Sequence, residues 1–426
     1  MKSVNIDLLG LGNVGSGVYK ILSGNKKDIM HREGLDINIK KILVRDKTKK
    51  RLVDVPESLL TEDFNDIIND NTVSIIAESI GGVEPAKDYI MRAMKSGKSV
   101  VTANKELIAK HWPVLNKTAQ DNGVGLYFEA SVCGGIPIIR TIWDSLQANN
   151  FSYIMGIING TTNYILSTMM EQGRDYLDVL KEAQAKGYAE PDPKNDVEGY
   201  DAVYKLSILS SLAFHARVPL EFIYSEGITN ITREDIDSAR ELGYVIKLLA
   251  IGKKSENTIE VRVHPTMIKA SHPLASVRDA FNAVFMYGSA VGEMMLYGKG
   301  AGDLPTGSAV VSDIIMASRC SEHRYTTFKN TESVSNDITF NNNWQSAFYV
   351  NMISMDRPGV LAKVAGIFAK YNVSVASVIQ KNRNSSEVPL IFITHKAKEI
   401  SFKQAISEIK ELSDVIAIKN TIRVED

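Results

Sequence analysis

Several residue types and patterns that define whole classes of protein are scarce or missing in this chain of 426 residues. Only two cysteines occur, Cys133 and Cys320, too few for a disulfide framework or a thiolate metal site. Lysine and arginine number 49 against 50 aspartates and glutamates, so a net charge of −1 gives no global attraction to nucleic acid or an acidic membrane. Apolar runs end well short of the ~18 residues that a spanning helix needs. The seven histidines form neither an H-E-x-x-H motif nor a Ser/His/Asp pattern.

What remains is the composition of a soluble multidomain protein. With 44% hydrophobic and 23% charged residues, the chain is able to form a core and is not disordered. Its length suits two or three domains. The first seven residues contain no apolar stretch of a secretion signal and run directly into an expected strand. We therefore expect a cytoplasmic protein with no nucleic-acid or membrane partner.

The first third of the chain alternates short apolar runs with amphipathic segments. Strands are expected at 4–9, 37–44, 73–80 and 99–103, with helices at 16–23 and 85–96. Such alternation predicts an α/β domain with a parallel sheet covered by helices on both faces. The segment Gly10-Leu11-Gly12-Asn13-Val14-Gly15 follows the first strand directly and opens the first helix. In that position G-x-G-x-x-G is typical of a dinucleotide-binding (Rossmann) domain.

The glycine segment predicts where a cofactor binds. Gly12 leaves room for a pyrophosphate, and backbone N–H groups around Leu11, Asn13 and Val14 would face it at the positive end of the helix. A structural glycine turn is the alternative interpretation. Arg45 ends the second strand and is followed by more basic residues, which favours the 2′-phosphate of NADP, although Asp46 could instead bind the ribose of NAD.

From about residue 129 the pattern changes to longer helices and separate β-rich segments. Helices are expected at 161–172, 177–186, 201–215, 234–252 and 307–318, and strands at 258–263 and 283–287. Residues 321–346 are polar and are expected to form a linker or a poorly packed edge. The last 80 residues predict strand, helix, two strands, helix and strand, the ferredoxin-like order. The expected divisions are 1–128 with 302–320 returning to it, 129–301, the linker 321–346, and 347–426.

Two lysines, an aspartate paired with one of them, and a glycine-rich segment are candidates for catalysis or ligand binding. Asp201 and Lys205 are the only charged residues between 201 and 214, and they lie four apart on one face of an otherwise apolar helix. Buried charges need partners, so this pair predicts either a catalytic lysine or a structural ion pair. Lys105 follows a probable parallel strand, at the edge where ligands bind, but could be a surface lysine. Glu129 begins a glycine-rich segment that could hold a cation or simply form a turn.

Five sequence blocks occur in order along the chain. The most specific block runs from Gly187-Tyr188-Ala189-Glu190-Pro191-Asp192-Pro193 through Asp196 and Asp201 to Lys205. The supporting blocks are residues 101–105, 129–137, 159–163 and 300–306. Taken together, they resemble the homoserine dehydrogenase family in its monofunctional bacterial form with a C-terminal ACT domain, and the resemblance covers essentially the whole chain.

That resemblance implies a role for each matching residue. Lys205 would be the proton donor and acceptor, Asp201 would orient it, and Lys105 would lie beside the nicotinamide. Glu190 and Asp196 would bind the substrate, and Gly187 and Gly302 would line the cofactor. The carboxylate of Glu129 and the backbone carbonyls of Val132, Gly134 and Ile136 would enclose a monovalent cation, expected to be Na⁺.

The resemblance also implies a reaction and a regulator. The expected reaction is reduction of L-aspartate 4-semialdehyde to L-homoserine with NADP(H), NAD(H) also being accepted by some members, in threonine, methionine and isoleucine biosynthesis. Residues 129–301 would bind substrate and mediate assembly into a homodimer or homotetramer. Asp356-Arg357-Pro358-Gly359-Val360-Leu361 resembles the ACT loop D-x-P-G-x-L, for which threonine is the expected effector. The alternative function is an amino-acid sensor with a non-catalytic Rossmann domain.

Overall fold

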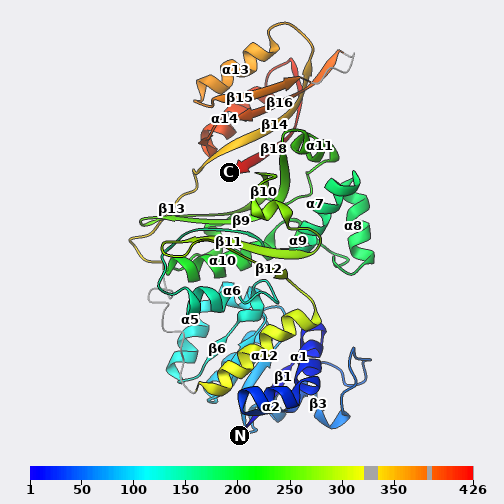
Figure 1. Ribbon diagram of the computed structural model, residues 1–426, viewed down its shortest axis with the longest axis vertical. Coiled ribbons are helices and arrows are strands. Elements are labelled where there is room, and N and C mark those ends of the chain that lie inside the picture. The colour runs from blue at the N-terminus through cyan, green and yellow to red at the C-terminus, as the bar shows by residue number, and fades with distance from the viewer. Residues whose placement is uncertain (321–333, 381–385, 426) are drawn as a thin grey trace.

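The computed structural model describes residues 1–320, 334–380 and 386–425, arranged as three parts in a row along the longest axis (Figure 1). The N-terminus lies in a parallel-sheet part at one end, and the ferredoxin-like part occupies the other end. A mixed sheet with several helices lies between them. Among the described residues, no helix combines the length and the apolar character needed to cross a membrane.

The first part is a six-stranded parallel sheet in the order β3-β2-β1-β4-β5-β6. Its strands are β1 (Lys2–Leu9), β2 (Leu35–Leu43), β3 (Leu60–Thr61), β4 (Val73–Glu78), β5 (Ser99–Thr102) and β6 (Leu126–Tyr127). The helices between them are α1 (Asn13–Gly24), α2 (Lys26–Glu33), α3 (Asn65–Ile68), α4 (Ala86–Lys95) and α5 (Lys105–Asp121). The predicted parallel α/β arrangement is confirmed. Strand order reverses beside β1, and ligands bind at such switch points, outside the carboxyl ends of the strands.

A helix from late in the chain completes this part. Helix α12 (Asp303–Arg319) packs against α1, as Figure 1 shows. The crossing is very close, because a Cβ added to Gly307 would lie 2.7 Å from the backbone of Gly17. The return of the chain after residue 302 therefore agrees with the expected division, although the boundaries themselves stay a prediction.

The middle and C-terminal parts share one sheet, in the order β12-β11-β7-β9-β10-β18-β14-β16-β15. The middle part contributes β7 (Phe151–Ile157), β8 (Tyr224–Ser225), β9 (Tyr244–Ser255), β10 (Thr258–Lys269), β11 (Phe281–Gly288) and β12 (Gly292–Lys299). Its helices are α6 (Ile138–Arg140), α7 (Gly160–Gln172), α8 (Tyr176–Ala185), α9 (Lys194–Val197), α10 (Tyr200–Phe214) and α11 (Arg233–Glu241). The predicted helices at 161–172, 177–186 and 201–215 are confirmed within one or two residues.

The predicted helix at 234–252 is wrong. Helix α11 ends at Glu241, and Gly243 then takes a left-handed φ of 80°, which turns the chain into strand β9. Strand β9 pairs with β7 on one side and β10 on the other, and its central residues are buried on both faces. A strand buried on both faces is apolar throughout, so its sequence has no period that separates it from a buried helix.

The C-terminal part has the predicted order of elements. It consists of β14 (Gln345–Met355), α13 (Val360–Lys370), β15 (Val375–Gln380), β16 (Glu387–Thr394), the short β17 (Ala397–Lys398), α14 (Glu399–Lys410) and β18 (Val415–Glu425). Residues 321–333 of the expected linker lie outside the described residues. The rest of it is mostly exposed or half-buried, but β13 (Thr339–Phe340) pairs with β10, and Trp344 is only 2% exposed.

The C-terminal part is joined to the middle part by its last strand. Residues 423–425 of β18 pair in parallel with residues 266–268 of β10. The guanidinium of Arg262, fully buried on β10, contacts the carboxylate of Glu425 at 2.8 Å. Arg423 contacts Glu399 at 2.6 Å and Glu226 of the middle part at 2.5 Å. Separation of the two parts would remove Glu425 from Arg262 and Glu226 from Arg423, leaving Glu260 and Glu399 as their acidic partners. Loss of part of a buried ion-pair network is destabilising.

Candidate active site

The glycine segment after β1 forms the turn that the sequence predicts. Gly10 has a left-handed φ of 97°, and Gly12 caps helix α1, leaving the first N–H groups of the helix open at the carboxyl end of the sheet. A Cβ on Gly15 would collide with the backbone of Gly10, so only glycine allows α1 to approach β1 this closely. The geometry fits a pyrophosphate at the positive end of a helix.

A groove of about 830 Å³ leads from this turn to the loop after β2. Its lining includes the predicted residues Leu11, Gly12, Asn13 and Arg45, together with Ser79, Ile80 and the basic residues 49–51. The Asp46 carboxylate, which could compete for a ribose, accepts hydrogen bonds from the N–H (2.8 Å) and hydroxyl (2.7 Å) of Thr48. Arg45 and its basic neighbours thus give this end of the groove a positive lining.

Two lysines from distant parts of the chain meet at one buried carboxylate. Lys205 Nζ lies 2.7 Å from Asp201 Oδ2, and Lys105 Nζ lies 2.8 Å from Asp201 Oδ1. The side chains of Asp201 and Lys205 are 7% and 11% exposed, whereas that of Lys105 is 40% exposed. Lys205 also donates to the carbonyl of Ile158 at 2.8 Å. The structure therefore brings together all three residues that were predicted to be catalytic.

Local sequence explains how each of these groups is held. Gly199, with a left-handed φ of 83°, starts α10, so Asp201 falls in the first turn and Lys205 one turn later on the same face. Lys105 is the first residue of α5, and the Asn104 side chain caps that helix by accepting from the N–H of Leu107. One lysine thus comes from the parallel-sheet part and the other from the middle part.

Asn159 is a site residue to which the sequence analysis assigned no role. Its side-chain oxygen caps α7 by accepting from the N–H of Thr162, and its amide nitrogen donates to Asp196 at 2.7 Å and to Asp201 at 2.9 Å. It therefore separates two carboxylates that would otherwise repel each other. Its position at the start of block 159–163, directly before an expected helix, was the available signal for a capping residue.

The charges of the site shift one another's protonation. Burial opposes ionisation of Asp201, but Lys205 and Lys105 outweigh it and hold the pKa of this carboxyl well below its usual range. Asp201 in turn raises the pKa of Lys105. Burial, and then the negative charge of Asp201, raise the pKa of Asp196. The arrangement keeps Lys105 protonated beside an ionised Asp201.

The predicted residues of segment 187–190 lie near this centre. The Tyr188 carbonyl accepts from the hydroxyl of Thr161 at the start of α7, which anchors the segment. The side chain of Glu190 is exposed, and its charge contributes to the raised pKa of Lys105. Gly187 follows α8 with a left-handed φ of 76°, and Gly302 caps α12 with a φ of 124°.

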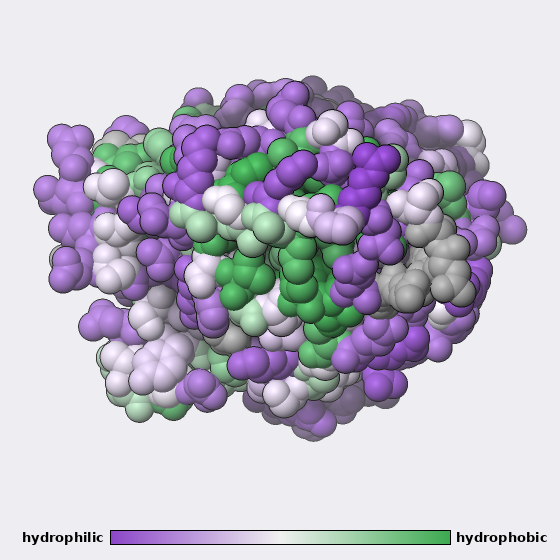
Figure 2. All heavy atoms as spheres, turned by 90° about the horizontal axis from the view of Figure 1, so that it is seen from above, coloured by the Kyte–Doolittle hydropathy of each residue, from purple (hydrophilic) through white to green (hydrophobic). Residues whose placement is uncertain are grey.

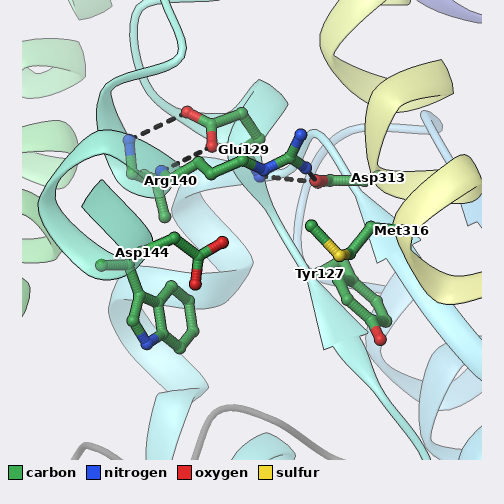
Figure 3. A pocket seen from close by; sticks show the side chains of 8 residues that line it. Tyr127, Glu129, Arg140, Asp144, Asp313 and Met316 are labelled. Carbon is green, nitrogen blue, oxygen red and sulfur yellow. Dashed lines mark hydrogen bonds and ion pairs between the residues drawn. The ribbon is translucent and has the colours of Figure 1, made fainter. Parts of the chain in front are cut away.

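The Glu129 carboxylate is buried and held by the backbone (Figure 3). It accepts from the N–H groups of Ile139 (2.9 Å) and Arg140 (2.7 Å), while the guanidinium of Arg140 contacts Asp313 at 2.8 Å. Burial, and then Asp313, raise the pKa of Glu129 to about 7; burial likewise raises the pKa of Asp313 to about 7. The Arg140 guanidinium thus pairs with Asp313, while backbone N–H groups hold the Glu129 carboxylate.

The glycine-rich chain after Glu129 is tightly fitted. A Cβ on Gly134 would lie 2.5 Å from the carbonyl oxygen of Gly300. The Ile136 carbonyl, one of the predicted cation ligands, accepts from the N–H of Ile138 at 2.7 Å. In the described residues no three His, Cys, Asp or Glu side chains cluster as a metal site. The predicted set differs from such a cluster because it combines one carboxylate with backbone carbonyls.

Family profiles match nearly the whole chain. The profile "Homoserine dehydrogenase, NAD binding domain" matches residues 10–129, "Homoserine dehydrogenase" matches 137–315, and "ACT domain" matches 348–414. The homoserine dehydrogenase of Bacillus subtilis strain 168 is 41% identical over 429 aligned residues, covering 100% of this chain and 99% of the relative. The chain belongs to the homoserine dehydrogenase family.

Solved structures of homoserine dehydrogenases agree with this. The one from Thiobacillus denitrificans superposes with a TM-score of 0.92 at 41% identity and covers 100% of this chain and 99% of that one. A hyperthermophilic archaeal homoserine dehydrogenase in complex with NADPH matches at a TM-score of 0.64 and 27% identity, covering 75% of this chain and 98% of that one. This homoserine dehydrogenase is thus an oxidoreductase with an NAD(P)-binding domain and an ACT domain.

Substitution of Asn159 tests its part in separating the carboxylates. Asn159→Ala removes the cap and two buried hydrogen bonds, and we expect a loss of about 2 kcal/mol. Asn159→Asp keeps the cap but adds a third carboxyl group beside Asp196 and Asp201. The two existing negative charges raise the pKa of the introduced carboxyl in the folded state. Folding then binds protons, and the stability of this variant falls as pH rises. Thermal midpoints at pH 5.5 and pH 8 should show a growing deficit for Asn159→Asp only; parallel curves would contradict this role.

Proposed function

We propose that this chain catalyses the reversible, NADPH-dependent reduction of L-aspartate 4-semialdehyde to L-homoserine, a cytoplasmic step in threonine, methionine and isoleucine biosynthesis. The observation that carries the proposal is the Asp201 carboxylate held between Lys105 and Lys205 at 2.8 and 2.7 Å. Reduction of an aldehyde places negative charge on its oxygen, and an adjacent ammonium both neutralises that charge and donates a proton. The family to which the chain belongs supports the same chemistry.

Each residue of the centre has a separate task. When bound, the nicotinamide cofactor supplies the hydride. Lys205 donates the proton to the aldehyde oxygen; Asp201 Oδ2 and the Ile158 carbonyl hold its ammonium in place. Lys105, whose side chain is more exposed, would face the nicotinamide and act as a second proton-handling group. Oxidation of homoserine requires a neutral amine at the same position, so this direction is favoured at high pH.

The substrate's amino group needs a carboxylate. Glu190 is exposed at the edge of the centre and is assigned this contact, with Asp196 closing the substrate site from the side of Asn159. Gly187 and Gly302 are assigned to the cofactor lining. Both have a left-handed φ and no side chain, which allows backbone to approach a bound ring closely.

Replacement of Lys205 tests the reaction most directly. Lys205→Ala should lower turnover at least ~10²-fold and leave NADPH affinity within about twofold, because it removes the proton donor and no cofactor contact. Steady-state kinetics and NADPH fluorescence titration measure the two effects. The control is Lys117→Ala, which removes an exposed lysine of α5 and should leave both turnover and NADPH affinity unchanged. Turnover at the wild-type level in Lys205→Ala would overturn the assignment.

The positive end of the cofactor groove supports a preference for NADP over NAD. Arg45 lines it together with Lys49, Lys50 and Arg51, while Asp46 is engaged by Thr48. Arg45→Ala should raise the KM for NADPH by about 10- to 100-fold, since a charge-assisted phosphate contact contributes about 1.5–3 kcal/mol. The KM for NADH should change less than twofold. Equal changes for both cofactors would show that Arg45 makes no phosphate contact.

A monovalent cation, Na⁺, at Glu129 is also part of the proposal. Glu129 is 4% exposed, and the guanidinium of its neighbour Arg140 contacts Asp313 instead. A bound cation would therefore offset the buried negative charge of Glu129. The carbonyls of Val132, Gly134 and Ile136 would complete the coordination of that cation. The pKa of Glu129 is raised to about 7, so the folded chain releases this proton only near that pH.

The pH dependence of cation stabilisation tests this site. Na⁺ should raise the thermal midpoint more at pH 8, where Glu129 is ionised, than at pH 5.5, where it is protonated. Tetramethylammonium at equal ionic strength is too large to enter and serves as the control, and Glu129→Gln should abolish the difference. Equal midpoints in both salts at pH 8 would exclude the cation.

The C-terminal part is proposed to bind threonine at the turn before α13. Gly359, with a left-handed φ of 91°, caps that helix. Residues 356–359 connect β14 to α13, and Val360 and Leu361 of the predicted motif form the first turn of the helix. The effector assay belongs on the full chain, because loss of residues 347–426 would leave the buried Arg262 without Glu425. This differs from a simple appended sensor, whose deletion would leave the rest intact.

Assembly into a homodimer or homotetramer is supported by apolar surface. Seen from its ferredoxin-like end, the molecule is largely hydrophilic, with hydrophobic side chains gathered near the middle of that face (Figure 2). Leu361, Val378 and Ile416 of this part are 42%, 37% and 46% exposed. On the edge strand β12, Met295 and Tyr297 are 37% and 53% exposed. Exposed apolar patches and open sheet edges are typical of contacts between copies.

A further inference from the structure

A carboxylate that the proposed mechanism does not use is buried at the cofactor groove. Glu78, the last residue of β4, is 0% exposed. It accepts from the N–H of Ile80 at 2.7 Å and of Gly81 at 3.3 Å, both in the loop that follows its own strand. Its other oxygen accepts from the hydroxyl of Thr102 at 2.5 Å, at the end of the neighbouring strand β5.

Thr102 continues the connection into the next loop. Its hydroxyl oxygen accepts from the N–H of Asn104 at 3.0 Å. The Asn104 amide donates back to the Gly82 carbonyl at 2.6 Å, and its oxygen caps α5 by accepting from the N–H of Leu107 at 3.1 Å. Hydrogen bonds therefore link the loop after β4 to the loop after β5 at both of their ends.

These two loops carry different halves of the proposed chemistry. Ser79 and Ile80, next to Glu78, line the cofactor groove. Lys105 directly follows Asn104 and contacts Asp201 across the junction with the middle part. A shift of either loop by a few tenths of an ångström would change the distance between the cofactor's reacting ring and Lys105, and such displacements strongly affect reaction rates.

A buried carboxylate is costly to keep at a site where a neutral side chain would suffice for packing. Burial raises the pKa of Glu78, while the Thr102 hydroxyl and the backbone N–H groups counteract this by favouring the charged form. A carboxylate has two acceptor oxygens, so Glu78 takes the N–H groups of its own loop on one and the Thr102 hydroxyl on the other. Glutamine would face Thr102 with an –NH₂ group, and the hydroxyl would have to accept from position 78 instead of donating to it.

We propose that Glu78, acting through Thr102, is a positioning residue that holds the 79–82 loop of the cofactor groove and Lys105 in one fixed relation. The proposal rests on the proposed roles of the groove and of Lys105. It predicts an effect on cofactor binding and turnover but not on substrate binding, because Glu190 and Asp196 lie on other elements.

Four variants test this role in the full-length enzyme. Glu78→Gln should raise the KM for NADPH and lower kcat, each about tenfold, with the KM for aspartate semialdehyde within twofold. Thr102→Val, which removes the hydroxyl at nearly equal volume, should change the same two constants in the same direction. Thr102→Ser keeps the hydroxyl and should restore both to within twofold. Thr118→Val removes a buried hydroxyl of α5 that bonds to the Val114 carbonyl, away from both loops, and should leave all three constants within twofold.

The outcomes separate a positioning role from a purely structural one. If Thr102→Val folds and keeps both kcat and the KM for NADPH within twofold, the proposal is overturned, even where Glu78→Gln fails to fold. A uniform loss of active protein, with unchanged constants in the folded fraction, also overturns it. Absence of activity in the wild-type enzyme would instead contradict the proposed function, so the two failures are distinguishable.

Discussion

A single buried carboxylate sets the requirements that the rest of this molecule meets. Asp201 is 5% exposed, and an ionised group at that depth is tolerable only with cations at hydrogen-bond distance. One of its partners, Lys205, lies on the same helix, but Lys105 belongs to the parallel-sheet part. The ion pair therefore requires α5 and α10 to pack closely, which brings the groove at the carboxyl ends of the parallel strands to the substrate side.

The same principle recurs at the other end of the middle part. Arg262 is fully buried and contacts Glu425, the last residue of β18, while Arg423 contacts Glu226 of the middle part. Glu226 directly follows Ser225, whose hydroxyl donates to the carbonyl of Glu198, two residues before α10 begins. The C-terminal strand is thus connected, through a short series of contacts, to the helix that carries Asp201 and Lys205. The ACT domain is therefore in contact, through Glu226, with the segment that leads into the helix of the active centre.

Sequence patterns identified those helices, strands and turns whose own residues show a hydrophobic period or a turn motif. The glycine turn at 10–15, the helix with its two charges at 201–205 and the βαββαβ order of the last 80 residues are examples. The pattern failed at 234–252, where Gly243 and pairing on both sides turn an apolar run into a central strand. Residues 334–346, expected to form a linker or a poorly packed edge, are mostly exposed or half-buried, but Trp344 among them is buried. Apolar character alone does not tell which neighbours bury a segment.

The sequence by itself determined the chemistry available to this protein: a dinucleotide turn, a lysine–aspartate pair on one helix face, and an acidic segment preceding it. These depend on spacings within a few residues, which local backbone geometry converts directly into proximity. Only the tertiary structure decided that Lys105 meets Asp201, that Asn159 separates two carboxylates, and that Glu78 links two loops. The long-range contacts among these join residues from 24 to 96 positions apart. Burial decides which distant charges must meet, a constraint that no local pattern records.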